Sequence, residues 1–155
     1  MQDLESVKKR ALLILGKRNF SEHEMTKRLI EKGATSKDAE EAVSWLVELG
    51  YINDSDYASS IVRYYAKKGY GVSRIKDELY KRKIQRELWD EKISEVDDTE
   101  MDDAALAFLQ KKLRGSDDKD DLRRASDALV RRGFNYDDAR TAVSKYLELT
   151  GAENA

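Results

Sequence analysis

Apolar residues recur every three or four positions along almost the whole chain, which is the spacing of one face of an α-helix. The first such segment covers about residues 4–17, and two more follow before residue 50. Ser21 and Glu24 have the spacing of a capping box at the start of the second segment. Gly33 and Gly50 stand where the second and third segments would end. Alternating strand patterns are scarce, and proline, which interrupts helices, is absent. The pattern predicts an all-α fold.

The helical pattern repeats with a fixed period. The segments RLIEKGA, ELYKRKI and ALVRRGF align without gaps, so Leu29, Leu79 and Leu129 are spaced by 50 residues each time (79−29 and 129−79). Two further sets of apolar positions keep the same offset: Val43, Ile93 and Val143, and Leu46, Val96 and Tyr146. Each repeat would hold three helices, and units this small gain stability by stacking on their neighbours. We therefore predict an elongated array of three tandem three-helix repeats, at residues 1–52, 53–98 and 99–155.

The joints between the predicted helices differ in character. GYINDSDYA (residues 50–58) predicts a tight connection, in which Asn53 and Asp54 are suited to cap the next helix. EVDDTEMDDAA (95–105) and LRGSDDKDDL (113–122) are acidic and loosely patterned. We expect the first of these to be a solvated, mobile joint between the second and third repeats, and the second to be a mobile loop within the third repeat.

Composition narrows the class of protein. The 155 residues include 29 Lys and Arg against 31 Asp and Glu, a formal net charge of −2, so any basic surface must be local. The absence of cysteine excludes disulfides and thiolate metal sites and is typical of a reducing cytoplasm, where we expect the protein to be located. No apolar run approaches the roughly 18 residues of a membrane helix, and the start of the chain lacks a signal-peptide core, so we expect no membrane partner.

Residues that carry catalysis or bind cofactors are scarce. The one histidine, His23, lies between Glu22 and Glu24 in the first turn of a predicted helix, without a second histidine or a cysteine to share a metal. The sequence contains no nucleophile elbow, P-loop or dinucleotide-binding motif, and GYGVSR (69–74) shares only two glycines with the last of these. We therefore expect no catalytic residue, no metal and no cofactor, and a protein that is not an enzyme.

Basic residues concentrate in the second repeat, where they alternate with tyrosines. Lys67, Lys68 and Arg74 flank the glycine turn GYG (69–71), after which a helix is expected to begin near residue 72. A helix N-terminus beside cations attracts phosphate or carboxylate, so the segment is either an anion cradle or a turn that presents its cations. We favour the turn, with Tyr70 packed on the joint or exposed to a partner. The candidate contact residues are Arg63, Lys67, Lys68, Tyr70, Arg74, Lys76, Arg82, Arg131 and Arg132.

Three interpretations of this basic surface stay open at this point: binding of nucleic-acid phosphates, binding of an acidic protein, and solvated helix faces paired with the abundant acids. Longer motifs favour a partner. The segments RALLILGKRNFSEHEMTKRLIEKG, GYINDSDYA and GYGVSRIKDEL resemble the RecX regulatory proteins of bacteria, and RRGFNYDDARTAV is similar to the closing segment of that family. The residues that match are Arg10, Ala11, Leu12, Arg18, Ser21, Glu24, Gly50, Tyr51, Ile52, Asp54, Tyr57, Ala58, Gly69, Tyr70, Gly71, Arg74, Ile75, Glu78 and Leu79.

The resemblance has departures. Val72 stands where the family usually has proline, and Lys83 precedes Ile84 where Gly-Ile is usual. DDKDDLRRAS (117–126) replaces a segment that is commonly rich in lysine.

The resemblance implies a fold and a function. RecX proteins are curved rows of three-helix repeats that bind the RecA recombinase, chiefly its filament on single-stranded DNA, and restrain its ATPase and strand exchange. We accordingly expect a monomeric regulator of RecA in recombination and the SOS response, with possible direct contact to DNA. Whether it caps filament ends or lies in the filament groove, and whether it inhibits or activates, stays open. The alternatives are a general nucleic-acid-binding helical-repeat protein that needs no RecA, and a scaffold for another acidic protein.

Overall fold

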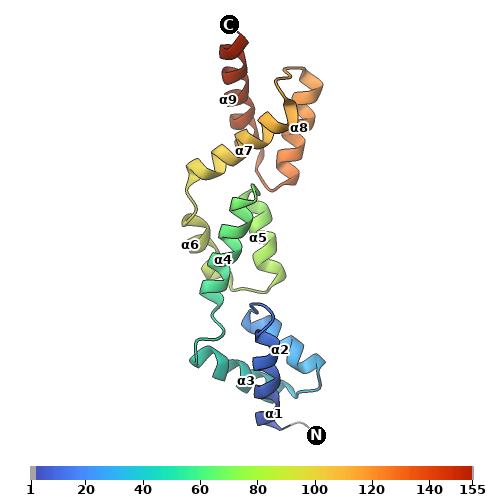
Figure 1. The fold of residues 1–155 in the computed structure, drawn as a ribbon, viewed down its shortest axis with the longest axis vertical. Helices are drawn as coiled ribbons and strands as arrows, with labels where there is room; N and C mark the ends of the chain where they lie inside the picture. Colours follow the sequence, from blue (N-terminus) through green and yellow to red (C-terminus); the bar gives the residue numbers. More distant parts are fainter. Residues whose placement is uncertain (1–2, 155) are drawn as a thin grey trace. The chain divides into compact units, whose positions relative to one another are not determined.

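The computed structural model describes the backbone of residues 3–154 and the side chains of residues 3–151, and all regular structure within that range is helical (Figure 1). This confirms the all-α class. The helices are α1 (Leu4–Leu15), α2 (Glu22–Glu31), α3 (Ser36–Glu48), α4 (Asp54–Lys67), α5 (Val72–Lys81), the 3-10 turn η1 (Arg86–Leu88), α6 (Trp89–Ser94), α7 (Asp98–Leu113), α8 (Lys119–Arg131) and α9 (Tyr136–Asn154).

The chain divides into two compact units. Within the described residues, the first unit comprises residues 3–60 and 79–90, and the second comprises residues 61–78 and 91–154. Helices α4 and α5 therefore contribute residues to both units. The repeat boundaries proposed from the sequence, after residues 52 and 98, stay a prediction.

In the first unit, α1 and α2 both pack against α3. The core is formed by Val7, Ala11, Phe20, Met25, Leu29, Ala34, Ala39, Ala42, Val43, Leu46 and Ile52. The start of α2 confirms the predicted capping box: the Ser21 hydroxyl accepts from the Glu24 amide at 3.1 Å, and the Glu24 carboxylate accepts from the Ser21 amide at 3.0 Å. Ser21 is fully buried, and its hydroxyl also donates to the carbonyl of Arg82 at 2.6 Å.

Asp54 has a different role from the one expected. Asn53 caps α4, because its side-chain oxygen accepts from the Asp56 amide at 3.1 Å. Asp54 instead accepts from the backbone amide of Glu22 at 3.0 Å, which satisfies a free donor at the start of α2. Asp54 is only 8% exposed, and this burial raises the pKa of its carboxyl, although the hydrogen bond from Glu22 opposes the shift.

In the second unit, α7, α8 and α9 pack against one another. Their core consists of Ala105, Leu109, Leu113, Ala125, Leu129, Phe134, Ala139, Ala142 and Tyr146. The three leucines that define the sequence repeat, Leu29, Leu79 and Leu129, are each 0% exposed. The 50-residue period therefore marks equivalent buried positions.

The first acidic segment predicted to be a loop, residues 95–105, is helical from Asp98 onward, so that part of the prediction was wrong. The second segment contains the predicted loop, at residues 114–118 between α7 and α8. The first turns of α7 begin at Asp98, and Asp97 caps them by accepting from the Thr99 amide at 2.9 Å. Asp118 caps α8, with the amides of Asp120 and Asp121 at 3.1 and 3.2 Å. Acidic side chains at helix N-termini satisfy free amides and interact favourably with the helix dipole.

Candidate functional site

The segment GYG (69–71) is the turn between α4 and α5, as predicted. Gly69 has a φ of 86°, a left-handed conformation that ends α4, and the Tyr70 amide closes the turn on the carbonyl of Tyr65 at 3.0 Å. Helix α5 begins at Val72.

Two amides at the start of α5 already have backbone partners, which argues against an anion cradle at this turn. The Gly71 amide donates to the carbonyl of Arg132 at 2.9 Å, and the Ser73 amide donates to the carbonyl of Gly133 at 3.0 Å. The start of α5 is thereby joined to the end of α8 by backbone hydrogen bonds. These two amides are not available to a phosphate.

Two glycines allow this junction. A β-carbon on Gly71 would lie 2.4 Å from the carbonyl carbon and oxygen of Gly133, and one on Gly133 would lie 2.5 Å from the amide nitrogen of Arg74. Gly133 also has a φ of 103°, which side-chain-bearing residues rarely adopt. The two backbones approach too closely for any other residue at either position.

Arg132 reinforces the junction instead of standing free for a partner. Its Nη2 donates to the carbonyl of Lys68 at 2.9 Å and its Nε donates to the carbonyl of Gly69 at 3.4 Å, so it satisfies two carbonyls of the turn that follows α4. Its guanidinium carbon lies 4.4 Å from the ring centre of Tyr70 and 5.1 Å from that of Phe108. Its charge remains next to the surface that these residues line.

Tyr70 and Arg74 also belong to the packed junction. The Arg74 guanidinium lies 4.8 Å from the centre of the Tyr70 ring, and its Nε donates to the buried carboxylate of Glu78 at 3.0 Å. Tyr70 is thus half-buried and packed on the joint, and its contact with a partner stays a prediction.

A recess of about 580 Å³ lies in front of this junction. We call it the cationic groove. Its charged lining residues are Lys67 and Lys68 of α4, Lys111 and Lys112 of α7, and Arg132, and its remaining lining residues are Gly69, Ala104, Ala107 and Phe108. No carboxylate lines it. Sequence reasoning missed Lys111 and Lys112. The only sequence signal for them was a pair of lysines in the last turn of a helix, three to five residues beyond Ala107 and Phe108.

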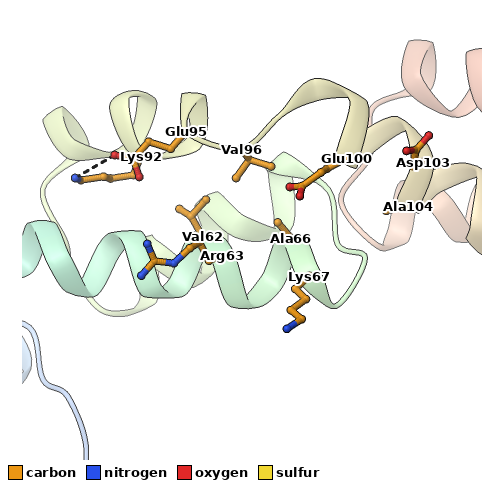
Figure 2. A pocket seen from close by; sticks show the side chains of 10 residues that line it. All are labelled: Val62, Arg63, Ala66, Lys67, Lys92, Glu95, Val96, Glu100, Asp103 and Ala104. Carbon is orange, nitrogen blue, oxygen red and sulfur yellow. Dashed lines mark hydrogen bonds and ion pairs between the residues drawn. The ribbon is translucent and has the colours of Figure 1, made fainter.

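A second recess, of about 700 Å³, shares Lys67 and Ala104 with the cationic groove. Figure 2 shows Val62 and Val96 pointing toward each other across it. Its charged lining residues are Arg63, Lys67, Lys92, Glu95, Glu100 and Asp103, so its charge is mixed. Lys92 is largely buried and pairs with Glu95 at 3.4 Å. Because positive and negative side chains both line this recess, it does not favour a partner of one charge.

The remaining predicted contact residues do not line the cationic groove. Arg63 lines the second recess, and Lys76 and Arg131 are exposed elsewhere on the second unit. Arg82 belongs to the first unit, where its Nε donates to the hydroxyl of Tyr57 at 3.1 Å. The structure thus brings together Lys67, Lys68 and Arg132 of the predicted set.

The described residues contain neither a cluster of metal-ligating side chains nor a membrane-spanning helix. Within that part of the chain, no three His, Asp or Glu side chains converge as the ligands of a metal ion would. Likewise, none of the described helices is long and apolar enough to cross a membrane.

Comparison with known proteins identifies relatives along most of the chain. Two family models match, the second three-helix domain of RecX at residues 53–93 and the third at residues 98–143. The regulatory protein RecX of Vibrio vulnificus is 30% identical over 141 residues, which cover 90% of this chain and 92% of that protein. The regulatory protein RecX of Pseudomonas syringae pv. tomato is 34% identical over 102 residues, or 59% and 66% of the two chains.

Solved structures share the fold. The crystal structure of RecX from Lactobacillus salivarius superposes with a TM-score of 0.85 at 20% identity, covering 92% of this chain and 96% of that one. A second crystal structure of regulatory protein RecX gives a TM-score of 0.80 at 19% identity, covering 90% and 70%. Together with the two matched domains, these structures confirm the prediction of three-helix repeats. The chain belongs to the RecX family of regulatory proteins.

Proposed function

We propose that the protein binds RecA and its filament on single-stranded DNA, and restrains ATP hydrolysis and strand exchange by that filament. The observation that carries the proposal is the match to regulatory protein RecX along 90% of the chain. The protein would act as a monomer in the bacterial cytoplasm, during recombination and the SOS response. It would regulate by binding alone, without catalysis or a cofactor.

The cationic groove is the part of the second unit best suited to contact such a partner. Its four lysines, Lys67, Lys68, Lys111 and Lys112, are all exposed, and no carboxylate lines the groove with them. A surface of one sign steers an oppositely charged partner and fixes its orientation. Tyr70, Arg74 and Arg132 would hold the groove in shape, while Arg63, Lys76 and Arg131 would add peripheral charge. Arg82 would contribute to the packing of the first unit.

The decisive experiment measures ATP hydrolysis by the cognate RecA on single-stranded DNA, with this protein titrated well below one molecule per RecA protomer. The expected result is inhibition at those ratios, because a regulator of a filament acts on many protomers at once. Unchanged hydrolysis, in an assay where RecA is fully active, would reject the proposal.

A matched pair of variants then tests the groove. Lys67→Gln combined with Lys68→Gln removes two charges from it, and Arg123→Gln combined with Arg124→Gln removes two exposed charges from a part of α8 that does not line it. We expect inhibition of RecA to weaken for the first pair and to persist for the second. Equal inhibition by both would remove the groove from the contact surface. Arg74 is unsuitable for this test, because its loss would also remove an ion pair from the buried carboxylate of Glu78.

The second candidate function is general nucleic-acid binding without RecA, which the carboxylate-free lining of the groove favours. It predicts that bare single-stranded DNA binds as tightly as the RecA filament, with an affinity that falls steeply as salt rises. Titration of labelled DNA, with and without RecA, separates the two functions. Preference for the filament supports regulation of RecA.

A further inference from the structure

We infer that the cationic groove binds a short acidic segment of a partner protein, with an apolar side chain of that segment seated against Ala107 and Phe108. The inference rests on the proposed function only in taking the partner to be a protein. It specifies the chemistry of the contact: carboxylates on the rim and one aliphatic anchor on the floor.

The first support is a set of lysines without ion pairs. None of Lys67, Lys68, Lys111 and Lys112 forms an ion pair with another described residue. Other exposed cations, such as Lys76 and Arg131, also lack an ion pair with a described residue. The groove is distinguished by the four ammonium groups that line one recess without a carboxylate. Their attraction is therefore directed outward, to an anionic ligand.

The second support is the short length of the positive surface. Helix α7 carries Glu100 and Asp103 toward its start and Lys111 and Lys112 at its end. From Asp103 to Lys111 the helix rises only about 12 Å. Glu100 and Asp103 line the adjoining recess, which shares Lys67 with the groove. A nucleic-acid strand carries a charge at every nucleotide and would meet these carboxylates in that direction, whereas an acidic segment of a few residues would not.

The third support is that cations contact the aromatic rings in and near the groove. Sequence-independent binding of single strands relies on open aromatic faces, on which bases stack. The Phe108 ring in the groove is instead contacted by the cations of Arg132 and Lys112, at 5.1 and 5.9 Å from its centre. Tyr64, which is exposed nearby on α4, is contacted by Lys68 at 5.5 Å. The apolar part of the lining, which consists of Ala104, Ala107 and part of Phe108, suits an aliphatic side chain.

The size of the groove agrees with this ligand. The groove measures about 580 Å³ and is largely open to solvent. A segment of a few residues can lie in a recess of this size. The lysine stems, which are flexible, let the ammonium groups adjust to carboxylates of different spacing.

The experiment measures fluorescence anisotropy of two probes with the full chain, in the absence of RecA. The first probe is a labelled peptide of alternating glutamate and aspartate with one central leucine, and the second is labelled oligothymidylate of matched charge. We expect Lys111→Gln combined with Lys112→Gln to weaken peptide binding roughly tenfold. The matched pair Arg123→Gln and Arg124→Gln should change it less than about twofold. Replacing the peptide leucine by glycine should also weaken binding.

Three results would overturn the inference. Oligothymidylate binding that falls as much as peptide binding in Lys111→Gln/Lys112→Gln would make the groove a site for nucleic acid. If the two pairs of substitutions weakened peptide binding equally, the attraction would come from the whole charged surface and not from the groove. If replacing the peptide leucine by glycine left the affinity unchanged, the apolar anchor would be rejected. If circular dichroism shows that the first pair is misfolded, Lys67→Gln with Lys68→Gln replaces it. Because RecA is absent from this experiment, its result does not depend on whether the protein inhibits ATP hydrolysis by RecA.

Discussion

Gly71 and Gly133 meet backbone to backbone, although 62 positions separate them in the chain (133−71). The amide of Gly71 donates to the carbonyl of Arg132, and the carbonyl of Gly133 accepts from Ser73, so the contact is fixed on both sides of the glycine pair. The cationic groove is built on this contact, because the end of α4 and the end of α8 both contribute lysine or arginine to it.

Substitution Gly71→Ala should lower the free energy of unfolding by about 2–3 kcal/mol. The added β-carbon would lie 2.4 Å from the carbonyl carbon of Gly133 and 2.5 Å from the amide of Phe134, and backbone atoms have no alternative rotamer. The φ of Gly71 is not in the left-handed region, so the effect is steric alone. Urea unfolding followed by circular dichroism measures it.

Gly16→Ala is the matched control for that substitution. Gly16 has a φ of −62°, and the atom closest to an added β-carbon is the carbonyl oxygen of Leu13 at 3.4 Å. Alanine there should be neutral or stabilise the protein by about 0.5 kcal/mol, because it restricts the unfolded chain. Equal changes at the two glycines would mean that the contact with Gly133 is not as close as described.

Arg132→Lys separates packing from charge. Lysine keeps the positive charge but cannot donate to the carbonyls of both Lys68 and Gly69 with one fork, so we expect a loss of about 1–2 kcal/mol in the free energy of unfolding. Arg131→Lys, at the exposed neighbouring position, should change it by less than about 0.5 kcal/mol. Thermal and urea unfolding of the two variants provide the comparison. If both behave alike, the hydrogen bonds of Arg132 contribute nothing measurable.

The sequence predicted the fold well because burial is periodic. Leu29, Leu79 and Leu129 are buried to the same degree, and the same helical spacing that places them in the core is visible in one dimension. Helix starts were harder to predict. The sequence predicts acidic loops around Asp97 and Asp118 and does not predict the helices that these residues cap, because a capping aspartate and a solvated one have the same local sequence.

The site was less predictable, because it depends on distances across the fold. Arginine is a common contact residue at protein surfaces. The guanidinium of Arg132 instead donates a hydrogen bond to the carbonyl of Lys68, which lies 64 positions away in the chain. Lys111 and Lys112 join Lys67 and Lys68 only when α7 packs beside the end of α4. Composition and spacing carry no trace of either relationship.

Lys83 has a left-handed backbone conformation, and glycine occupies the equivalent position in the other two repeats. Its φ is 55°, and the residues 50 positions before and after it, Gly33 and Gly133, have φ values of 106° and 103°. Left-handed backbone costs a side-chain-bearing residue about 1–2 kcal/mol. Lys83→Gly should therefore stabilise the protein by about 0.5–1 kcal/mol, after allowance for the greater freedom of glycine in the unfolded chain. Urea unfolding measures the gain.

The reverse substitution provides the control for Lys83. Gly33→Lys places a side chain in the same type of conformation one repeat earlier, and should destabilise the protein by about 1–2 kcal/mol. The Lys83 ammonium lies 3.9 Å from the centre of the Tyr80 ring, and loss of this contact works against the gain. A loss of stability in Lys83→Gly would show that the contact with Tyr80 outweighs the backbone strain.

Asp54→Asn tests whether the folded protein is more stable with the Asp54 carboxyl protonated than with it ionised. Burial raises the pKa of Asp54 above its ordinary value of 3.8, and it raises the pKa of nearby Glu22 in the same direction. A raised pKa in the folded state means that the contribution of this carboxyl to stability is present below the ordinary value and is lost as the pH rises through the folded-state value. Asparagine keeps an oxygen to accept from the Glu22 amide and carries no charge. The variant should therefore gain stability relative to the parent protein between about pH 3 and about pH 7, as measured by urea unfolding.

Asp56→Asn, an exposed position in the same turn, reports what the loss of a negative charge at a helix N-terminus does by itself. If the stability advantage of Asp54→Asn over the parent protein decreased as the pH rises, the hydrogen bond from Glu22 would favour the ionised carboxyl more than burial penalises it.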